Sequence, residues 1–230
     1  MPATPENPRP TKLMKRWEEP GDVRFLTFSC YDRLPLFGND AIKDLFVEHL
    51  ARVTAPPTIR LIAWVVMPEH IHLIVQPLPE DAPPVPLDPS SGERCETFDH
   101  WKDPVAPRTF SGQTSNEPGP KAKMGPVARM LYDLKRPFAR DVLARWRELN
   151  APILKRITDK SGPHHSHFFQ PGGGYDHNLR TDTDVNDKVD YIHANPVERG
   201  LCRFETDWKW SSIHAYKGGH YTGPPIEQPI

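Results

Sequence analysis

The chain has 230 residues with a formal net charge of −1, of which 37% are hydrophobic, 28 are proline and three are cysteine. This length suffices for one core, and the high proline content indicates that part of the chain lies outside it. The scattered cysteines Cys30, Cys95 and Cys202 exclude a disulfide framework or a cysteine–zinc site, and no apolar run is long enough to span a bilayer. We therefore expect a cytoplasmic protein.

The amino-terminal half predicts a disordered leader followed by a strand and a helix. Residues 1–21 contain prolines and mixed charges without an apolar run, which is typical of a disordered segment. Val23–Tyr31 alternates and is rich in β-forming residues, so it predicts the first strand. Gly38-Asn39-Asp40 is a turn and cap signal, and apolar residues at helical spacing then predict a helix over 40–53.

Two histidines stand out in the next pair of predicted strands. Ile59–Val66 predicts a strand, and Pro68 separates it from a third strand that begins within Met67–Val75, so the two should form an antiparallel hairpin. Side chains alternate along a strand, so His70 and His72 share one face, and Ile71, Leu73 and Val75 lie on the other. This spacing suits a metal ion, although two histidines without a third ligand are more often structural.

The composition and charge of the sequence change twice in the middle of the chain. Ten prolines fall between Pro77 and Pro120, and residues 80–120 hold eight acidic and three basic side chains, so 77–125 predicts a disordered insertion. Residues 121–160 instead hold eleven basic and four acidic side chains. A local basic surface is therefore compatible with the nearly neutral total.

Apolar spacing predicts a helix over 126–149, which begins at Pro126 and which Pro137 should kink or divide. The polar side of this helix is either a solvated face or a phosphate-contact surface, and it carries Arg129, Lys135, Arg136, Arg140, Arg145 and Arg147.

The carboxy-terminal part predicts one more strand and one more helix. Residues 164–170 predict the fourth strand, and the glycines at 172–174 predict a sharp turn or a close approach of another group. Thr181 and the acidic residues after it predict the start of a helix, which should end near Asn195 because Pro196 cannot continue it.

This order of elements fits a ferredoxin-like α+β sandwich with a central antiparallel sheet and one added carboxy-terminal helix. The single domain would comprise residues 22–76 and 126–216, and 217–230 would form a flexible tail. On the last helix Tyr191 falls about 120° from the apolar stripe, with Asn195 beside it one turn later. Surface tyrosines are common, so this position alone does not establish a catalytic role.

Four segments together resemble a known family. The runs WVVMPEHIHLIV, FFQPGGGYDHNLR, DYIHANPVERGL and DWKWSSIHAY, in this order, strongly resemble the single-tyrosine HUH transposases, and within them the REP-associated tyrosine transposases. The resemblance covers about residues 22–216 without the insertion. It implies a nucleoid-associated enzyme that cleaves and rejoins single-stranded DNA near repeat hairpins.

The resemblance also implies a site. His70 and His72 would bind a divalent metal, Mg²⁺ or Mn²⁺, and Tyr191 would be the nucleophile that forms a 5′-phosphotyrosine link. Asn195 would be the third ligand, where related transposases usually have Gln; Asn is one methylene shorter but offers the same carbonyl oxygen. The expected DNA-binding residues are Arg129, Lys135, Arg136, Arg140 and His177.

Several alternatives remain open from the sequence. The chain can be an inactive or domesticated protein that binds structured DNA, or a metallohydrolase that uses a bound water. Tyr191 can act within its own chain or in the partner of a homodimer. Glu69 can orient a histidine or cap the hairpin, and Trp208 and Trp210 can stack bases or pack in the core.

Overall fold

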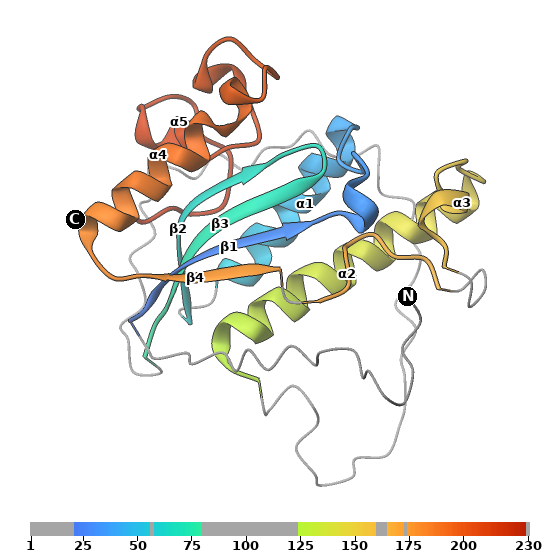
Figure 1. Ribbon diagram of the computed structural model, residues 1–230, viewed down its shortest axis with the longest axis horizontal. Coiled ribbons are helices and arrows are strands. Elements are labelled where there is room, and N and C mark those ends of the chain that lie inside the picture. The colour runs from blue at the N-terminus through green and yellow to red at the C-terminus, as the bar shows by residue number, and fades with distance from the viewer. Residues whose placement is uncertain (1–20, 56–57, 80–123, 160–164, 173, 229–230) are drawn as a thin grey trace, which may run out of the picture.

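A single antiparallel sheet of four strands organises the molecule (Figure 1). The structure is a computed structural model that describes residues 21–55, 58–79, 124–159, 165–172 and 174–228. The strand order is β2-β3-β1-β4, and the strands are β1 (Val23–Ser29), β2 (Ile59–Val66), β3 (His70–Pro77) and β4 (Tyr175–Leu179). The helices are α1 (Asp40–Thr54), α2 (Pro126–Glu148), α3 (Leu154–Ile157), α4 (Asp182–Glu198) and α5 (Ile213–Tyr216).

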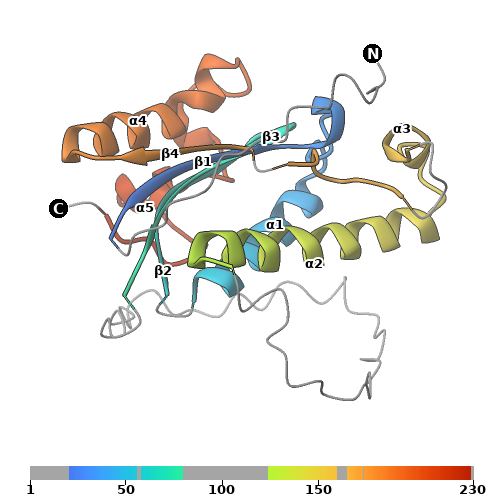
Figure 2. The same ribbon diagram turned by 60° about the horizontal axis from the view of Figure 1, so that its bottom comes forward.

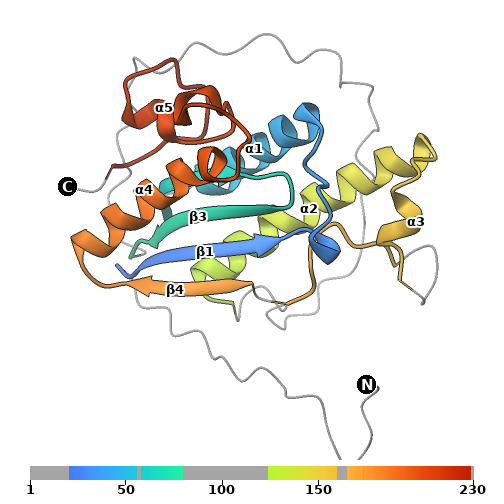
Figure 3. The ribbon, with the colours of Figure 1, turned by 45° about the horizontal axis from the view of Figure 1, so that its top comes forward.

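The order of elements and the order of strands confirm the expected ferredoxin-like α+β fold with one added helix. Helices α1 and α2 cover one face of the sheet and α4 covers the other (Figure 2). β4 forms one edge of the sheet, beside β1 (Figure 3). The strand with the two histidines is therefore an inner strand, paired with β1 on one side and β2 on the other.

Local signals in the sequence fix the ends of the main elements. The Asn39 side chain accepts a hydrogen bond from the backbone N–H of Ala41 at the start of α1. Thr181 and Asp184 form a reciprocal capping box at the start of α4. In the hairpin, the backbone N–H of Met67 donates to the carbonyl of His70 at 2.9 Å, which closes the turn between β2 and β3.

The two faces of the sheet have separate cores. Ile71, Leu73 and Val75 of β3 point towards α1 and α2, where they join a large cluster of buried aromatic and aliphatic side chains. Ile74 and Phe25 point towards α4 and pack against its apolar stripe, which consists of Val185, Val189 and Ile192. The alternation expected for the histidine strand is thus confirmed.

The fourth strand lies later in the chain than the sequence pattern predicts. Within 165–170 only isolated bridges form, at Ser166 and Phe169, and the paired strand is Tyr175–Leu179. The reason is that Phe168 and Phe169 are both buried, and both contact Phe138 of α2. Two consecutive side chains cannot enter the same core from a regular strand, whose side chains alternate between faces.

The two helical prolines do not end their helices. Pro137 lies inside the continuous helix α2, between the buried side chains Leu134 and Phe138, so tertiary packing holds the helix across the missing hydrogen bond. Pro196 lies in the last turn of α4, which runs on to Glu198. There the backbone N–H of Arg199 donates to Asn195 O at 3.0 Å and completes the turn.

The segment after α5 packs on the domain through residue 228 and does not behave as the expected free tail. Tyr221 accepts a hydrogen bond from the indole of Trp64 at 2.9 Å, and Glu227 forms an ion pair with Arg60 at 2.6 Å. The predicted leader and most of the predicted insertion, 80–123, lie outside the described residues. Among the helices that the structure describes, none combines the length and the apolar character needed to cross a membrane.

We expect replacement of Phe138 by Ala to lower the free energy of unfolding by about 3–5 kcal/mol, because the ring is fully buried among Phe37, Phe46 and Phe168. Urea denaturation followed by circular dichroism measures this change. Leu149→Ala, at the exposed end of the same helix, should change stability by less than about 0.5 kcal/mol. Equal effects of both substitutions would contradict the placement of Phe138 in the core.

Candidate active site

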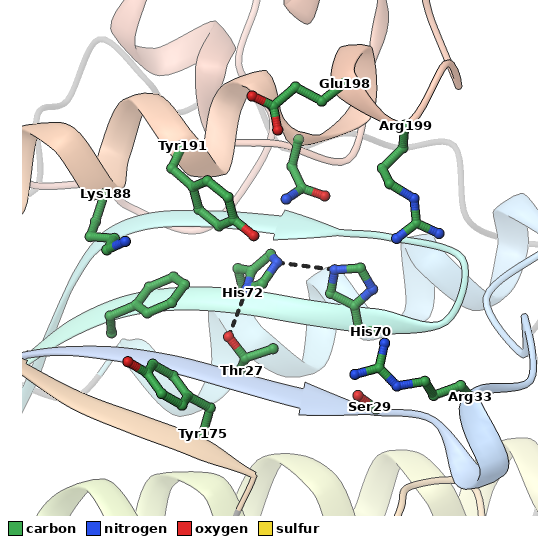
Figure 4. Close-up of a pocket in the computed structure, with 12 residues that line it drawn as sticks. Thr27, Ser29, Arg33, His70, His72, Tyr175, Lys188, Tyr191, Glu198 and Arg199 are labelled. Atoms are coloured by element: carbon green, nitrogen blue, oxygen red, sulfur yellow. Dashed lines mark hydrogen bonds between the residues drawn. The ribbon is translucent and has the colours of Figure 1, made fainter.

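The two histidines lie side by side beneath α4 (Figure 4). Strand pairing sets their position, because His72 lies opposite Thr27 and His70 lies opposite Ser29 in the register of β1 and β3. Both imidazoles are buried, and their Nε2 atoms are 3.0 Å apart. The edge of His70 faces the ring of His72, with centres 4.6 Å apart.

Each histidine has a hydrogen-bond partner at its other ring nitrogen. Glu69 Oε1 lies 3.2 Å from His70 Nδ1, and a carboxylate only accepts, so this contact places the proton of His70 on Nδ1. Thr27 Oγ1 lies 2.7 Å from His72 Nδ1, and a hydroxyl can donate or accept. His72 can therefore carry its proton on either nitrogen: on Nε2 it donates to His70 Nε2, and on Nδ1 it donates to Thr27 and leaves both Nε2 atoms unprotonated.

Both histidines are held in the neutral state. Burial lowers the pKa of His70, although the neighbouring Glu69 carboxylate opposes this shift. Burial, together with the charges of His70 and Lys188, lowers the pKa of His72 to about 3. Neutral imidazoles are the form that binds metal ions, so the site is ready to bind one without first losing protons at neutral pH.

Tyr191 reaches the histidines from α4. Its ring is 39% exposed, and its centre lies 5.5 Å from that of His72. The hydroxyl points towards the two imidazoles (Figure 4). The ammonium of Lys188, one turn earlier on the helix, lies 5.2 Å from the centre of the tyrosine ring. A cation and a phenol therefore occupy the same side of the site, within a single chain.

Asn195 completes the group of predicted site residues. It lies one turn after Tyr191 and lines the same pocket as His70 and His72. Its Oδ1 atom is buried and has no hydrogen-bond partner among the described residues. An unpaired buried acceptor destabilises a protein by about 1–3 kcal/mol, so its presence here indicates that a further group belongs in the pocket.

The donor set fits a divalent cation. Two ligands at right angles around an ion with bonds of about 2.1 Å lie about 3.0 Å apart, and the two Nε2 atoms have this separation. The unpaired amide oxygen of Asn195 supplies a hard third donor. The described residues hold no group of three His, Cys, Asp or Glu side chains that could bind a metal, so the candidate donors here are two imidazoles and one amide.

The pocket over the histidines has a volume of about 560 Å³ and a cationic rim. Arg33, Lys188 and Arg199 line it, and Arg33 and Arg199 approach His70 from opposite sides (Figure 4). Arg199 donates to Glu69 Oε1 at 2.6 Å, which neutralises the carboxylate that holds His70. An anionic group of the size of a phosphodiester is the ligand that such a rim favours.

Sequence reasoning predicted four of the residues that line this pocket and missed eight, which are Phe25, Thr27, Ser29, Arg33, Tyr175, Lys188, Glu198 and Arg199. Thr27 was within reach of prediction, because it lies two positions after Phe25 on the same face of the first strand. Lys188 was also within reach, because it lies one helical turn before Tyr191. Glu69 was predicted as one of two options, and its contact with His70 agrees with the orienting one. Arg33 and Arg199 gave no signal, since their approach depends on the loop after β1 and on the continuation of α4 past Pro196.

The predicted basic helix lies away from the site. α2 covers the opposite face of the sheet, where Lys135 sits 5.0 Å from the ring centre of Phe28. On the same helix Arg136 donates to the hydroxyl of Tyr132, Arg140 pairs with Asp141 at 3.0 Å, and Arg129 is exposed. A DNA contact by these side chains stays a prediction, and it requires DNA that extends around the domain.

The remaining polar candidates divide between structure and surface. Asp176 pairs with Arg24 at 2.8 Å across β1 and β4, so it has a structural contact. His177 belongs to β4 rather than to a loop, and it is exposed on the face that bears the site. Trp208 donates to the carbonyl of Val66 and Trp210 donates to Asp44, and both pack against the core.

Comparisons with known proteins agree with the motifs. No model of a known protein family matches the chain. A REP-associated tyrosine transposase of Escherichia coli K12 is 35% identical over 74 residues, which are 32% of this chain and 41% of that protein. The chain thus matches less than half the length of that relative. A Haemophilus influenzae protein named for the same family is 24% identical over 194 residues, or 84% of this chain and 81% of that one.

A solved structure shares the fold. It is a REP-associated tyrosine transposase bound to a REP hairpin, with a TM-score of 0.52 and 18% identity, over 96% of this chain and 99% of that chain. At this identity the likeness concerns the fold alone. The sequence motifs, the two relatives and the shared fold all point the same way, and the family that they support is that of the REP-associated tyrosine transposases.

Proposed function

We propose that the protein is a metal-dependent transesterase that cleaves and rejoins single-stranded DNA beside repeat hairpins, with Tyr191 as the nucleophile. One observation carries this proposal: a tyrosine hydroxyl points at two neutral histidines in a pocket that also contains the unpaired buried oxygen of Asn195. The hairpin is the ligand named for the structural neighbour, and we extend it to this chain.

The chain's own residues would act on a phosphodiester as follows. Arg33, Lys188 and Arg199 hold the phosphate over the histidines and balance its charge. The Tyr191 oxygen attacks phosphorus while the bond to the 3′ oxygen breaks, which gives a 5′-phosphotyrosine and a free 3′-hydroxyl. The tyrosine loses one proton and the 3′ oxygen gains one, so the reaction is balanced and reversible without a nucleotide cofactor.

His70, His72 and Asn195 would hold the Mg²⁺ or Mn²⁺ ion. A phenol has a pKa of about 10 and is a weak nucleophile at neutral pH. A bound divalent ion supplies Lewis-acid polarisation of a non-bridging phosphate oxygen. Glu69 and Thr27 orient the two imidazoles through their Nδ1 atoms, so the Nε2 lone pairs can face the ion.

We expect Tyr191→Phe to abolish formation of a covalent protein–DNA adduct, because the attacking oxygen is absent. The assay incubates the protein and Mn²⁺ with DNA hairpins that carry single-stranded arms from the flanks of its own gene, followed by denaturing electrophoresis. Hairpin affinity should change by less than about threefold, since the ring remains in place.

The matched control is Tyr175→Phe, which removes a hydroxyl from another exposed tyrosine of the same pocket and should leave the adduct intact. Cut DNA without covalent protein, unchanged in Tyr191→Phe, would show hydrolysis by water instead. Tight binding that EDTA does not affect, with no cleavage of any hairpin, would show a DNA-binding protein without activity.

We expect Asn195→Leu to separate metal binding from folding. Without metal its free energy of unfolding should stay within about 1 kcal/mol of that of the wild type, because the substitution removes an unpaired buried acceptor. The rise in melting temperature that Mn²⁺ causes in the wild type should be lost, with at least about tenfold weaker metal binding by calorimetry.

Asn195→Gln should keep the metal response, because it retains the amide oxygen. Asn186→Leu, on the exposed side of the same helix, should keep it as well. If Mn²⁺ stabilised Asn195→Leu as much as the wild type, Asn195 would not be a ligand.

A further inference from the structure

Tyr175 is the most exposed aromatic side chain of the pocket. It is 56% exposed, compared with 39% for Tyr191, and it is the first residue of the edge strand β4. Its side chain lies on the face of the sheet that carries His72 and Thr27, across the pocket from α4 (Figure 4). Its hydroxyl makes no hydrogen bond to the described residues, and its side chain lines the pocket.

The ring of Tyr175 is held in place by contacts with neighbouring aromatic rings. Tyr175 meets Phe25 edge to face, with centres 6.0 Å apart and an interplanar angle of 68°. It lies nearly parallel to the ring of His177, with centres 6.1 Å apart. Phe25 also contacts Tyr191 at 6.1 Å and stacks on His72 at 5.4 Å. The buried ring of Phe25 therefore separates Tyr175 from Tyr191 and from the histidines.

The glycines before Tyr175 place it there. Gly174 has a φ of +70°, and a Cβ at this position would lie 2.2 Å from the carbonyl oxygen of Thr27, so only glycine allows β4 to begin so close to β1. Gly172 has a φ of +108°, and a Cβ there would meet no atom within 4 Å. The chain thus brings Tyr175 into register opposite Thr27 and leaves it 56% exposed.

Packing alone does not account for this arrangement. The contact between Tyr175 and Phe25 is edge to face, and the ammonium of Lys188 also lies near Phe25, 5.6 Å from its ring centre. More than half of Tyr175 remains exposed beside a pocket whose cations suit a phosphate. Aromatic faces next to basic side chains are the combination that binds unpaired nucleotides.

We propose that Tyr175 stacks an unpaired nucleobase of the DNA strand next to the phosphate that Tyr191 attacks, with His177 supporting the ring. This inference rests on the proposed function and specifies its ligand: a nucleotide in the single-stranded part of the substrate, outside the paired stem. Stacking uses a π-face that every base has, so this contact positions the strand with little preference for base identity.

The test combines a protein variant with an altered DNA. A hairpin with single-stranded arms from the flanks of the gene is prepared with one abasic site, moved along the arms one nucleotide at a time. Affinities for the full-length protein are measured by fluorescence anisotropy in EDTA, where no chemistry interferes. We expect one or two abasic positions to weaken wild-type binding by about 5- to 150-fold, which is the effect of losing one stacked base.

Tyr175→Ala should weaken binding to the intact hairpin by the same factor, and those abasic positions should then cause no further loss. Tyr175→Leu, which keeps apolar cover over Phe25, should behave like Tyr175→Ala, and Tyr175→Phe should bind like the wild type. Phe204→Ala removes another aromatic ring, 57% exposed and outside the pocket, and should leave the affinity unchanged.

Equal abasic penalties in the wild type and in Tyr175→Ala would overturn the proposal, as would wild-type affinity of Tyr175→Ala for the intact hairpin. The adduct assay separates this result from the fate of the proposed function. If adducts form but no base shows coupling to Tyr175, the stacking proposal is refuted and the proposed transesterase activity stands. If a base shows coupling to Tyr175 but no adduct forms, the stacking proposal stands and the proposed transesterase activity is refuted.

Discussion

The antiparallel pairing of β3 with β1 at the centre of the sheet is the interaction on which the rest of the site depends. It sets the face on which His70 and His72 emerge, and it brings Thr27 to the Nδ1 atom of His72. A shift of this register by one residue would turn both imidazoles into the apolar core under α1 and α2. Burial of Ile71, Leu73 and Val75 in that core opposes such a shift.

A second packing contact brings Tyr191 to the histidines. The apolar stripe of α4 docks on Phe25 and Ile74, which lie on the same sheet face as the two imidazoles. With the stripe in place, helical geometry directs Tyr191 and Asn195 to the side, over His72 and His70. Phe25 thus has two roles, since it fills the core under α4 and it separates the aromatic rings that line the pocket.

The site combines features that would be unfavourable elsewhere in the protein. Asn195 has a buried oxygen without a partner, and Asp32 and Arg33 both have a φ near +50°, in a region that residues other than glycine rarely adopt. The loop that contains them is held by the segment after α3, where Gln170 accepts a hydrogen bond from the backbone of Asp32. Arg33 and Asn195 both line the pocket over the histidines.

The sequence by itself determined the first three strands, the three long helices, the order of elements that defines the ferredoxin-like fold and the faces of those regular segments. Alternation in β3 and the stripe of α4 were readable because each depends on neighbours within one element. The capping residues Asn39 and Thr181 were readable for the same reason. The four residues His70, His72, Tyr191 and Asn195 were brought together by a family resemblance, and the structure places all four around one pocket.

Only the tertiary structure decided what depends on contacts between distant segments. Phe168 and Phe169 look like part of a strand, yet burial of both against Phe138 leaves the sheet edge to Tyr175–Leu179. Pro196 looks like a helix end, yet the helix continues and carries Arg199 to Glu69. The basic face of α2 was predicted as either a solvated face or a phosphate-contact surface, and only the tertiary structure shows that it lies on the other side of the sheet from the site, because α1 and α2 share the opposite core. Local sequence pattern determines the face of a strand or helix on which a side chain lies. Long-range packing alone determines which residues that face contacts.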